Sequence, residues 1–187
     1  IVVGVLKDRE LSPSARLLDE RLGGALLRAM AASRFRGKHG QTLILLAPGN
    51  GGVERVLLLG LGAAGELDEM KCEALGAAVV AALGGSGAAS AYLAVDAVDG
   101  GPLAPPAIAA RIALGATLRA YRFAKYFTAE KDDDKPSLGA LVLGCADAKR
   151  ARKLFEPMAA VADAVAATRD IVSEPANVIF PETMAAE

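Results

Sequence analysis

The chain has 187 residues, of which 53% are hydrophobic, so it is long enough to bury a substantial core and short enough to form one domain. Its 21 basic and 22 acidic residues give a formal net charge of −1, which excludes a general electrostatic attraction to nucleic acids or anionic membranes. No apolar run approaches the ~20 residues of a membrane-spanning helix, and the N-terminus has no signal-peptide pattern. We therefore expect a soluble, cytoplasmic protein.

Short apolar runs alternate with longer segments of helical periodicity, which predicts an α/β domain. The predicted strands are residues 1–6, 43–46, 53–59, 91–95 and 138–143. The predicted helices are residues 13–32, residues 67–83 and a segment from Pro105 with Phe123 on its apolar face, and a further helical region covers residues 147–172. Between the second and third strands, residues 48–52 are dense in turn-forming residues and predict a hairpin or another tight connection.

Proline and capping residues predict several helix ends. Ser12 is the expected N-cap of the first helix, with Pro13 at its first position. Pro157 is expected to break the last helical region into a short helix and a second one that continues to Ser173. Glu174 must leave the helix because it precedes a proline. The expected core residues of that second helix are Met158, Val161, Val165, Ile171 and Val172.

The segment Gly60-Leu61-Gly62-Ala63-Ala64-Gly65 has the G-x-G-x-x-G spacing of a dinucleotide-binding turn between a strand and a helix. The acidic residue that binds ribose should follow after ~20 residues, whereas Asp96 comes 31 residues after the last glycine. Glu66, Asp68 and Glu69 put negative charge where phosphates would lie, and such acids also stabilise a helix N-terminus. A structural turn is favoured, and phosphate binding stays open.

Other polar residues give weaker signals. His39, the only histidine, lies among basic residues without a catalytic partner and is expected to be solvated. Asp132, Asp133 and Asp134 lack the spacing of a calcium-binding loop and are expected to be a solvated charge run. A basic surface is predicted at Lys149, Arg150, Arg152 and Lys153.

The aromatic and sulfur-containing residues predict packing rather than chemistry. Core and rim packing, in preference to a stacking platform, is expected for Tyr121, Phe123, Tyr126 and Phe127. Cys72 and Cys145 are far apart in the sequence and match no disulfide or zinc-binding pattern, so both are expected to be buried thiols of a reducing compartment.

Residues 168–183 read Thr-Arg-Asp-Ile-Val-Ser-Glu-Pro-Ala-Asn-Val-Ile-Phe-Pro-Glu-Thr. They closely resemble the R-D-L-V-N-x-P-A-N-x-x-x-P-E segment that joins the N-terminal and catalytic domains in the leucyl aminopeptidase (cytosol aminopeptidase) family of metallopeptidases, with Ser173 in place of the usual Asn. The opening strand, the Gly-Leu-Gly of residues 60–62 and the spacing Gly115-x-x-Leu118-x-x-Tyr121-x-Phe123-x-x-Tyr126 agree with the N-terminal domain of that family. The resemblance covers nearly the whole chain.

This resemblance implies a macro-domain-like α/β fold with a mixed sheet flanked by helices. It implies that residues 1–173 form a non-catalytic N-terminal domain and that residues 174–187 begin the connection to a C-terminal catalytic domain. Two divalent metal ions, Zn or Mn, and an N-T-D-A-E-G-R segment belong to that catalytic domain, and the segment is not found in residues 1–187. No catalytic, cofactor-binding or metal-binding residue is therefore expected in this chain.

The leading hypothesis is the N-terminal domain of an intracellular aminopeptidase that releases N-terminal residues such as Leu from peptides and works as a homo-hexamer. The domain would then contribute to assembly and active-site access, with its own catalytic domain, further copies and peptide substrates as partners, and with neither a membrane nor nucleic acid. The alternative is a macro-like module that binds ADP-ribose or a nucleotide at the Gly60–Gly65 turn. The apolar start and the proline-containing end also lead us to expect a piece of a longer protein.

Overall fold

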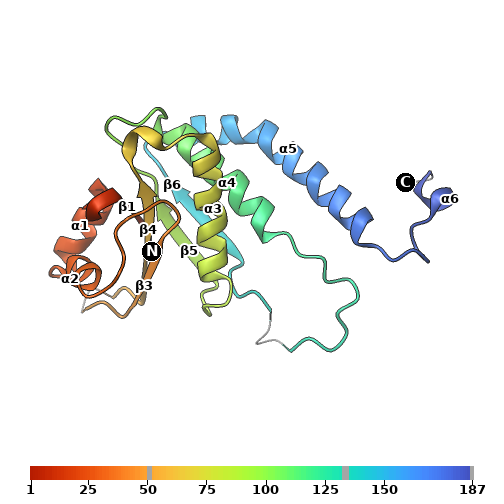
Figure 1. The fold of residues 1–187 in the computed structure, drawn as a ribbon, viewed down its shortest axis with the longest axis horizontal. Helices are drawn as coiled ribbons and strands as arrows, with labels where there is room; N and C mark the ends of the chain where they lie inside the picture. The colour runs from red at the N-terminus through yellow and green to blue at the C-terminus, as the bar shows by residue number, and fades with distance from the viewer. Residues whose placement is uncertain (50–51, 132–134, 186–187) are drawn as a thin grey trace.

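The structure, a computed structural model, describes residues 1–49, 52–131 and 135–185. A sheet of mixed strand direction lies between two layers of helices (Figure 1). One layer contains α1 (Pro13–Arg21) and α2 (Ala25–Ala31), and the other contains α3 (Glu69–Leu83) and α4 (Pro105–Ala120). The long α5 (Ala148–Ser173) and the short α6 (Pro181–Met184) follow. The expected α/β fold with a mixed sheet flanked by helices is confirmed.

The sheet has the strand order β3-β4-β1-β5-β6, with the short β2 paired to β1. The strands are β1 (Val2–Leu6), β2 (Glu10–Leu11), β3 (Thr42–Leu46), β4 (Arg55–Gly62), β5 (Ser90–Ala94) and β6 (Ala140–Gly144). β1, β4, β5 and β6 are parallel, whereas β3 pairs antiparallel with β4, with Thr42 opposite Leu59 and Leu46 opposite Arg55. The two apolar runs thus pair as consecutive antiparallel strands, as a hairpin requires, and residues 50 and 51 of the predicted turn lie outside the described residues.

Each helix layer covers its own core on one face of the sheet. Val56 and Leu58 of β4 belong to the core beneath α1 and α2. Leu57 and Leu59 of the same strand belong to the core beneath α3 and α4. Because successive side chains of a strand point to opposite faces, a strand that is covered on both sides reads as an unbroken apolar run.

The prediction of one helix over residues 13–32 is wrong, because two helices occupy this region. Gly23 and Gly24 have φ angles of 60° and 80°, which interrupt the helix between α1 and α2. The buried carboxylate of Asp19 accepts the N–H of Leu26 at 2.7 Å. It thereby provides a hydrogen-bond partner for one of the backbone N–H groups that the first turn of α2 leaves unpaired. The predicted N-cap Ser12 is confirmed, since its side chain accepts the N–H of Ala15.

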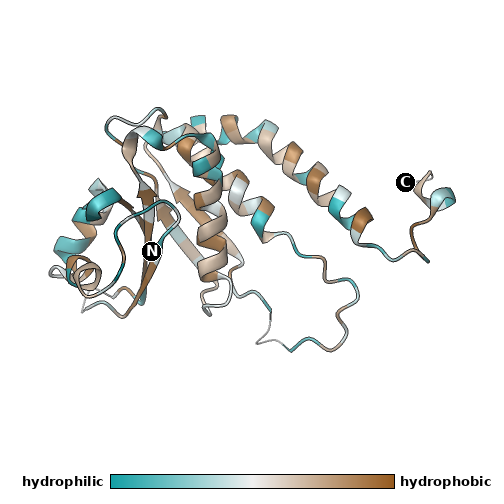
Figure 2. Ribbon diagram, viewed as in Figure 1, coloured by the Kyte–Doolittle hydropathy of each residue, from teal (hydrophilic) through white to brown (hydrophobic). Residues whose placement is uncertain are grey.

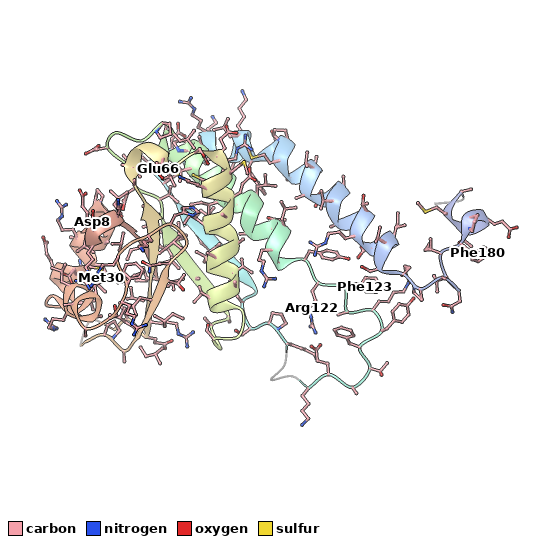
Figure 3. The ribbon with its side chains drawn as sticks, viewed as in Figure 1. Asp8, Met30, Glu66, Arg122, Phe123 and Phe180 are labelled. Carbon is pink, nitrogen blue, oxygen red and sulfur yellow. The ribbon has the colours of Figure 1, made fainter. Side chains whose placement is uncertain are left out.

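Two predictions about the later helices are also wrong. α4 ends at Ala120, and Figure 3 shows Arg122 and Phe123 on the segment beyond it, away from the sheet. α5 is one continuous helix of 26 residues that contains Pro157. Pro157 lacks the N–H that would bond the carbonyl of Lys153, but both residues are exposed, so water can satisfy this carbonyl.

α5 does not bury the residues that its apolar pattern predicted. Val161, Val165 and Val172 are 58%, 37% and 78% exposed, and Ala162 is the one buried residue of this fully described helix. Its principal neighbour is α4. Figure 1 shows that the second half of α5 extends beyond the end of α4. The expectation of a core-facing second half is therefore wrong.

Two glycines let α3 and α4 approach each other backbone to backbone. A Cβ added at Gly115 of α4 would lie 1.8 Å from the carbonyl oxygen of Glu73 in α3. A Cβ added at Gly76 of α3 would lie 2.0 Å from the carbonyl oxygen of Ile112 in α4. Arg111 of α4 also forms an ion pair with Glu73 at 2.9 Å. This close contact fixes the position of α4. Because α5 packs on α4, it also fixes the position of the first half of α5.

Gly115→Ala is expected to lower the free energy of unfolding by about 1–3 kcal/mol, because the new methyl group must push the two helices apart. This loss should appear although Ala is the better helix former by about 1 kcal/mol. Urea denaturation followed by circular dichroism measures the change. In the control Gly85→Ala, an added Cβ meets nothing within 4 Å, and the change should stay within about 0.5 kcal/mol. Equal effects at both positions would contradict the close contact.

Candidate functional site

The Gly60–Gly65 turn lies at the carboxyl end of β4 and packs against the loop of residues 37–41. Gly60 and Gly62 donate their backbone N–H groups to carbonyl oxygens of this loop, at 2.7 and 3.0 Å. A Cβ added at Gly60 would lie 2.1 Å from another carbonyl oxygen of the loop, and Gly62 has a φ of 83°. These two glycines are therefore required for a contact between two chain segments, and their N–H groups are already used.

The helix after this turn is also capped from within the chain. α3 begins with Asp68 as its N-cap, and the Asp68 carboxylate accepts the N–H of Lys71 at 2.8 Å. Glu66, labelled in Figure 3, forms an ion pair with the Lys71 ammonium at 2.9 Å, and this hydrogen bond lowers the pKa of Glu66. A phosphate here would meet two carboxylates instead of free N–H groups. The geometry favours the structural interpretation of the turn.

Asp96, the candidate ribose ligand, instead ties the start of α1 to the end of β5. Its carboxylate accepts the hydroxyls of Ser12 and Ser14 at 2.5 and 2.6 Å, and the N–H of Ser14 at 3.0 Å. The cavity beside Asp96, at the carboxyl ends of β1, β4 and β5, has a volume of about 20 Å³. This space suits about one water molecule rather than a nucleotide.

His39 is half-buried, so the expectation of a solvated side chain is wrong. Its Nε2 lies 3.0 Å from the carbonyl oxygen of Lys71, which assigns the proton to Nε2 so that the ring can donate. The imidazole thereby links the loop of residues 37–41 to α3. In the described ranges, no three His, Cys, Asp or Glu side chains gather into a group that could hold a metal ion.

The remaining candidates also lie where they serve structure. Cys72 is buried, and burial raises the pKa of its thiol to about 12, which keeps it protonated and unreactive. Cys145 is only half-buried.

The predicted basic surface is confirmed, since all its members are exposed: Lys149, Arg150, Arg152 and Lys153. The predicted charge run Asp132–Asp134 lies outside the described residues. No helix in the described part of the chain is both long and apolar enough to cross a bilayer.

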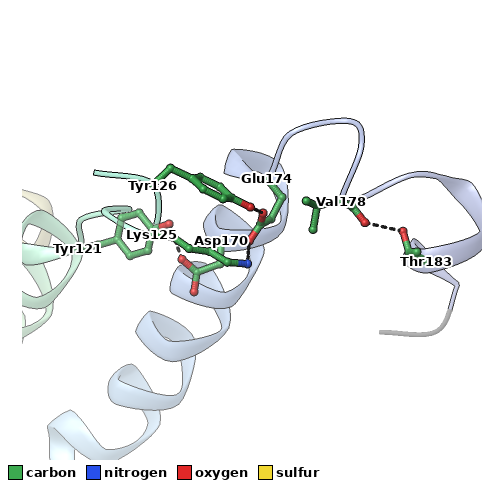
Figure 4. Close-up of polar contacts among 7 residues, drawn as sticks. All are labelled: Tyr121, Lys125, Tyr126, Asp170, Glu174, Val178 and Thr183. Atoms are coloured by element: carbon green, nitrogen blue, oxygen red, sulfur yellow. Dashed lines mark hydrogen bonds and ion pairs between the residues drawn. The ribbon is translucent and has the colours of Figure 1, made fainter. Parts of the chain in front are cut away.

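A group of five polar residues joins the segment after α4 to the end of α5 (Figure 4). Glu174 accepts hydrogen bonds from the Lys125 ammonium at 2.5 Å and from the Tyr126 hydroxyl. Asp170 accepts the Tyr121 hydroxyl at 2.7 Å. The partners are 48 or 49 residues apart in the sequence. We call these five residues the Glu174 cluster.

The Glu174 cluster is shielded around its central carboxylate. The side chain of Glu174 is 10% exposed, compared with 56% for Lys125. The hydrogen bonds from Lys125 and Tyr126 lower the pKa of Glu174, and the same contacts with Glu174 raise the pKa of Lys125 and of Tyr126. Burial, followed by the hydrogen bond to Asp170, raises the pKa of Tyr121. All four shifts favour an ionised carboxylate beside a charged lysine and neutral tyrosines.

Arg169 adds a further connection between the same two segments. Its guanidinium lies 4.0 Å from the centroid of the Tyr121 ring and donates a hydrogen bond to the carbonyl oxygen of Leu118 at 3.1 Å. Beyond the cluster, the Thr183 hydroxyl donates to the carbonyl oxygen of Val178 at 3.0 Å and closes the turn before α6 (Figure 4). These contacts fix the direction in which the chain leaves α5.

The Glu174 cluster was not predicted from the sequence. Core and rim packing is only partly right for the aromatic residues, because Tyr126 and Phe127 are 47% and 58% exposed and the tyrosine hydroxyls bind carboxylates. No local signal was present, because Asp170 lies in the last turn of α5 whereas Glu174 follows the helix in an extended conformation. The hydrogen bonds to Glu174 raise the pKa of Lys125 and of Tyr126, so both groups are held protonated rather than activated as nucleophiles, which indicates a structural role.

Solved structures share this fold. Tomato leucine aminopeptidase, in a mutant form, has a TM-score of 0.74 and 25% sequence identity, and the match covers 99% of this chain and 37% of that one. The bottromycin maturation enzyme BotP has a TM-score of 0.71 and 24% identity, with 99% of this chain and 35% of that chain covered. The class of protein is thus an α/β domain that occurs as one part of larger enzymes.

The sequence comparisons define the family. The family model described as "Cytosol aminopeptidase family, N-terminal domain" matches residues 2–130. A "Probable cytosol aminopeptidase" of Caulobacter vibrioides is 43% identical over 176 residues, which are 94% of this chain and 34% of that protein. A protein of the same name from Bradyrhizobium sp. is 38% identical over 170 residues, which are 89% and 34% of the two chains.

The chain therefore belongs to the cytosol aminopeptidase family, as the resemblance of residues 168–183 predicted, and it corresponds to the N-terminal domain of that family. It spans about a third of the length of the curated relatives that it matches.

The Glu174 carboxyl is expected to titrate below the ordinary glutamate pKa of about 4.3. Because its pKa is lowered in the folded state, its stabilising contribution is present above the unfolded pKa and is lost as the pH falls through the folded pKa. A ¹³C NMR titration of the side-chain carboxyl measures this midpoint. Lys125→Met should raise the midpoint more than Tyr126→Phe, because the lysine makes the larger contribution. An ordinary midpoint that neither variant moves would show that the cluster does not form in solution.

Proposed function

We propose that this chain is the non-catalytic N-terminal domain of a metal-dependent aminopeptidase. The observation that carries the proposal is the match to the N-terminal domain of the cytosol aminopeptidase family, together with relatives of about three times the length. In this proposal residues 1–173 form the domain and residues 174–187 begin the connection to a catalytic domain. The exit of the chain from α5 at Glu174 supports this boundary.

The catalytic residues belong to the downstream domain. Within the described residues of this chain, the side chains do not fit a metal pair, because no group of three potential ligands gathers. Two divalent ions, Zn or Mn, bound in the downstream domain would activate water and polarise the scissile carbonyl of a peptide substrate. The reaction is the release of N-terminal residues such as Leu in the cytoplasm, by an enzyme assembled as a hexamer.

The contribution of this domain is to shape assembly and access to the active site. The contacts of the Glu174 cluster support this role, since they tie the end of the helix that leads to the downstream domain to the segment that follows α4. A nucleotide-binding role for the Gly60–Gly65 turn lacks such support, because the N–H groups of Gly60 and Gly62 are paired and the adjacent cavity is small.

The 187-residue chain, supplied with Mn²⁺ or Zn²⁺, is expected to release no product from a leucyl chromogenic substrate above the background of the metal alone. A longer polypeptide that continues past residue 187 to the length of the relatives should hydrolyse the same substrate, and a chelator should abolish this activity. Absorbance assays at equal molar concentrations measure both. Metal-dependent turnover by the 187-residue chain would overturn the assignment of the catalytic residues to the downstream domain.

A further inference from the structure

A cavity lies at the start of β4, at the end of the strand opposite to the Gly60–Gly65 turn. The amino ends of the parallel strands β1, β4 and β5 meet there with the end of α3. The cavity has a volume of about 590 Å³, within the range of about 300–1,000 Å³ that is usual for sites of small molecules. It is therefore large enough for an organic ligand, unlike the small space beside Asp96.

Arg55 brings a positive charge to the wall of this cavity. Its backbone is held on both sides, because it pairs with Leu46 of β3 and its carbonyl oxygen accepts the backbone nitrogen of Ile1 at 2.9 Å. Its Nη1 donates a hydrogen bond to the Ser86 hydroxyl at 3.0 Å. Ser86 donates its own proton to the carbonyl oxygen of Leu83 at 2.8 Å, so the Ser86 oxygen is held as an acceptor. We call this cavity the Arg55 pocket.

The Arg55 guanidinium has only this neutral partner. None of the ion pairs among the described residues includes it. Its Nε is buried and has no hydrogen-bond partner in the described part of the chain. Glu54, an acidic residue of the lining, is exposed and does not pair with it. A buried charged donor without an acceptor is unfavourable, because it has lost its hydration without replacement.

The open side of the guanidinium indicates which ligand fits. The Ser86 hydroxyl uses Nη1, which leaves the edge formed by Nε and Nη2. A carboxylate binds such an edge through two parallel hydrogen bonds, which are stronger than bonds between neutral groups. The lining also offers apolar surface, since Val53 and Ala88 are half-buried. Figure 2 shows that the second half of α3, which ends at the pocket, is hydrophobic, whereas the first half carries the hydrophilic residues.

We propose that the Arg55 pocket binds a small organic carboxylate. The two carboxylate oxygens accept hydrogen bonds from Nε and Nη2 of Arg55, and the apolar part of the ligand contacts Val53 and Ala88. The apolar surroundings screen this ion pair less than water does. The inference does not rest on the proposed function, because it uses only groups of this chain and no catalytic step.

An NMR titration of the ¹⁵N-labelled 187-residue chain with isocaproate, a branched carboxylate, tests the proposal. The Nε–H signal of Arg55 and the amide signals of Gly87 and Ala88 should shift until they saturate. The Nε–H signal should also move downfield, as a donor to a carboxylate does. Isocaproamide has the same shape without the charge, and acetate has the charge without the apolar part. Each should bind at least tenfold more weakly than isocaproate.

Variants assign the binding to this pocket. Arg55→Met keeps an unbranched apolar side chain and should weaken isocaproate binding at least tenfold. The matched control Arg21→Met removes an exposed arginine of α1 and should leave the affinity unchanged. Ala88→Leu keeps Arg55 and fills part of the pocket, so it should also weaken binding at least tenfold. This variant and the comparison with isocaproamide test the proposal even where Arg55→Met does not fold.

Equal affinities for isocaproate and either comparison compound would overturn the proposal, as would equal effects of Arg55→Met and Arg21→Met. A titration without any saturable shift would also overturn it, because the pocket would then hold only water. The titration is repeated with a longer polypeptide that carries further residues before Ile1. An unchanged affinity there supports the proposal, whereas a loss of binding would contradict it, because the added residues would then fill the pocket.

Discussion

The backbone contact between α3 and α4 is the constraint on which the C-terminal half of the structure depends. Gly76 and Gly115 allow the two helices to approach at a distance that any side chain would forbid. Because α4 is the principal neighbour of α5, this contact also sets the direction of α5. The end of α4 then delivers Tyr121 and Tyr126 to the carboxylates of α5. The close approach of α3 and α4 in this way determines where the end of α5 lies.

The central strands β1 and β4 were predictable because they are buried on both faces and therefore appear as continuous apolar runs. The errors have separate physical causes. The four-residue apolar period over residues 13–32 continues across Gly23 and Gly24, so it did not reveal the break between α1 and α2. Pro157 was expected to end a helix, but an exposed position lets water satisfy the carbonyl that loses its partner. The valines of α5 were assigned to the core of this domain, although an apolar helix face can equally serve a partner.

The candidate site was predictable only in part. The glycine turn was correctly favoured as structural from the acids that follow it, and the structure adds the loop of residues 37–41 as the reason for the glycines. The Glu174 cluster was not predicted, because its partners are 48 or 49 residues apart and no local period connects them. Its members nevertheless come from the two segments that carried the family resemblance, residues 115–126 and 168–183. The contacts account for three motif residues, Tyr121, Tyr126 and Asp170, whereas Lys125 and Glu174 stand at positions that the two motifs leave open.

The central claim is that the second half of α5 projects from the α/β body, beyond the end of α4 (Figure 1). Small-angle X-ray scattering of the 187-residue chain measures this most directly. A compact chain of this length has a radius of gyration of about 16 Å, whereas a helix of 26 residues is about 39 Å long. The account predicts a radius of gyration clearly above about 16 Å. A value at that limit, with the scattering profile of a compact globule, would contradict it, because α5 would then already be folded against its own domain.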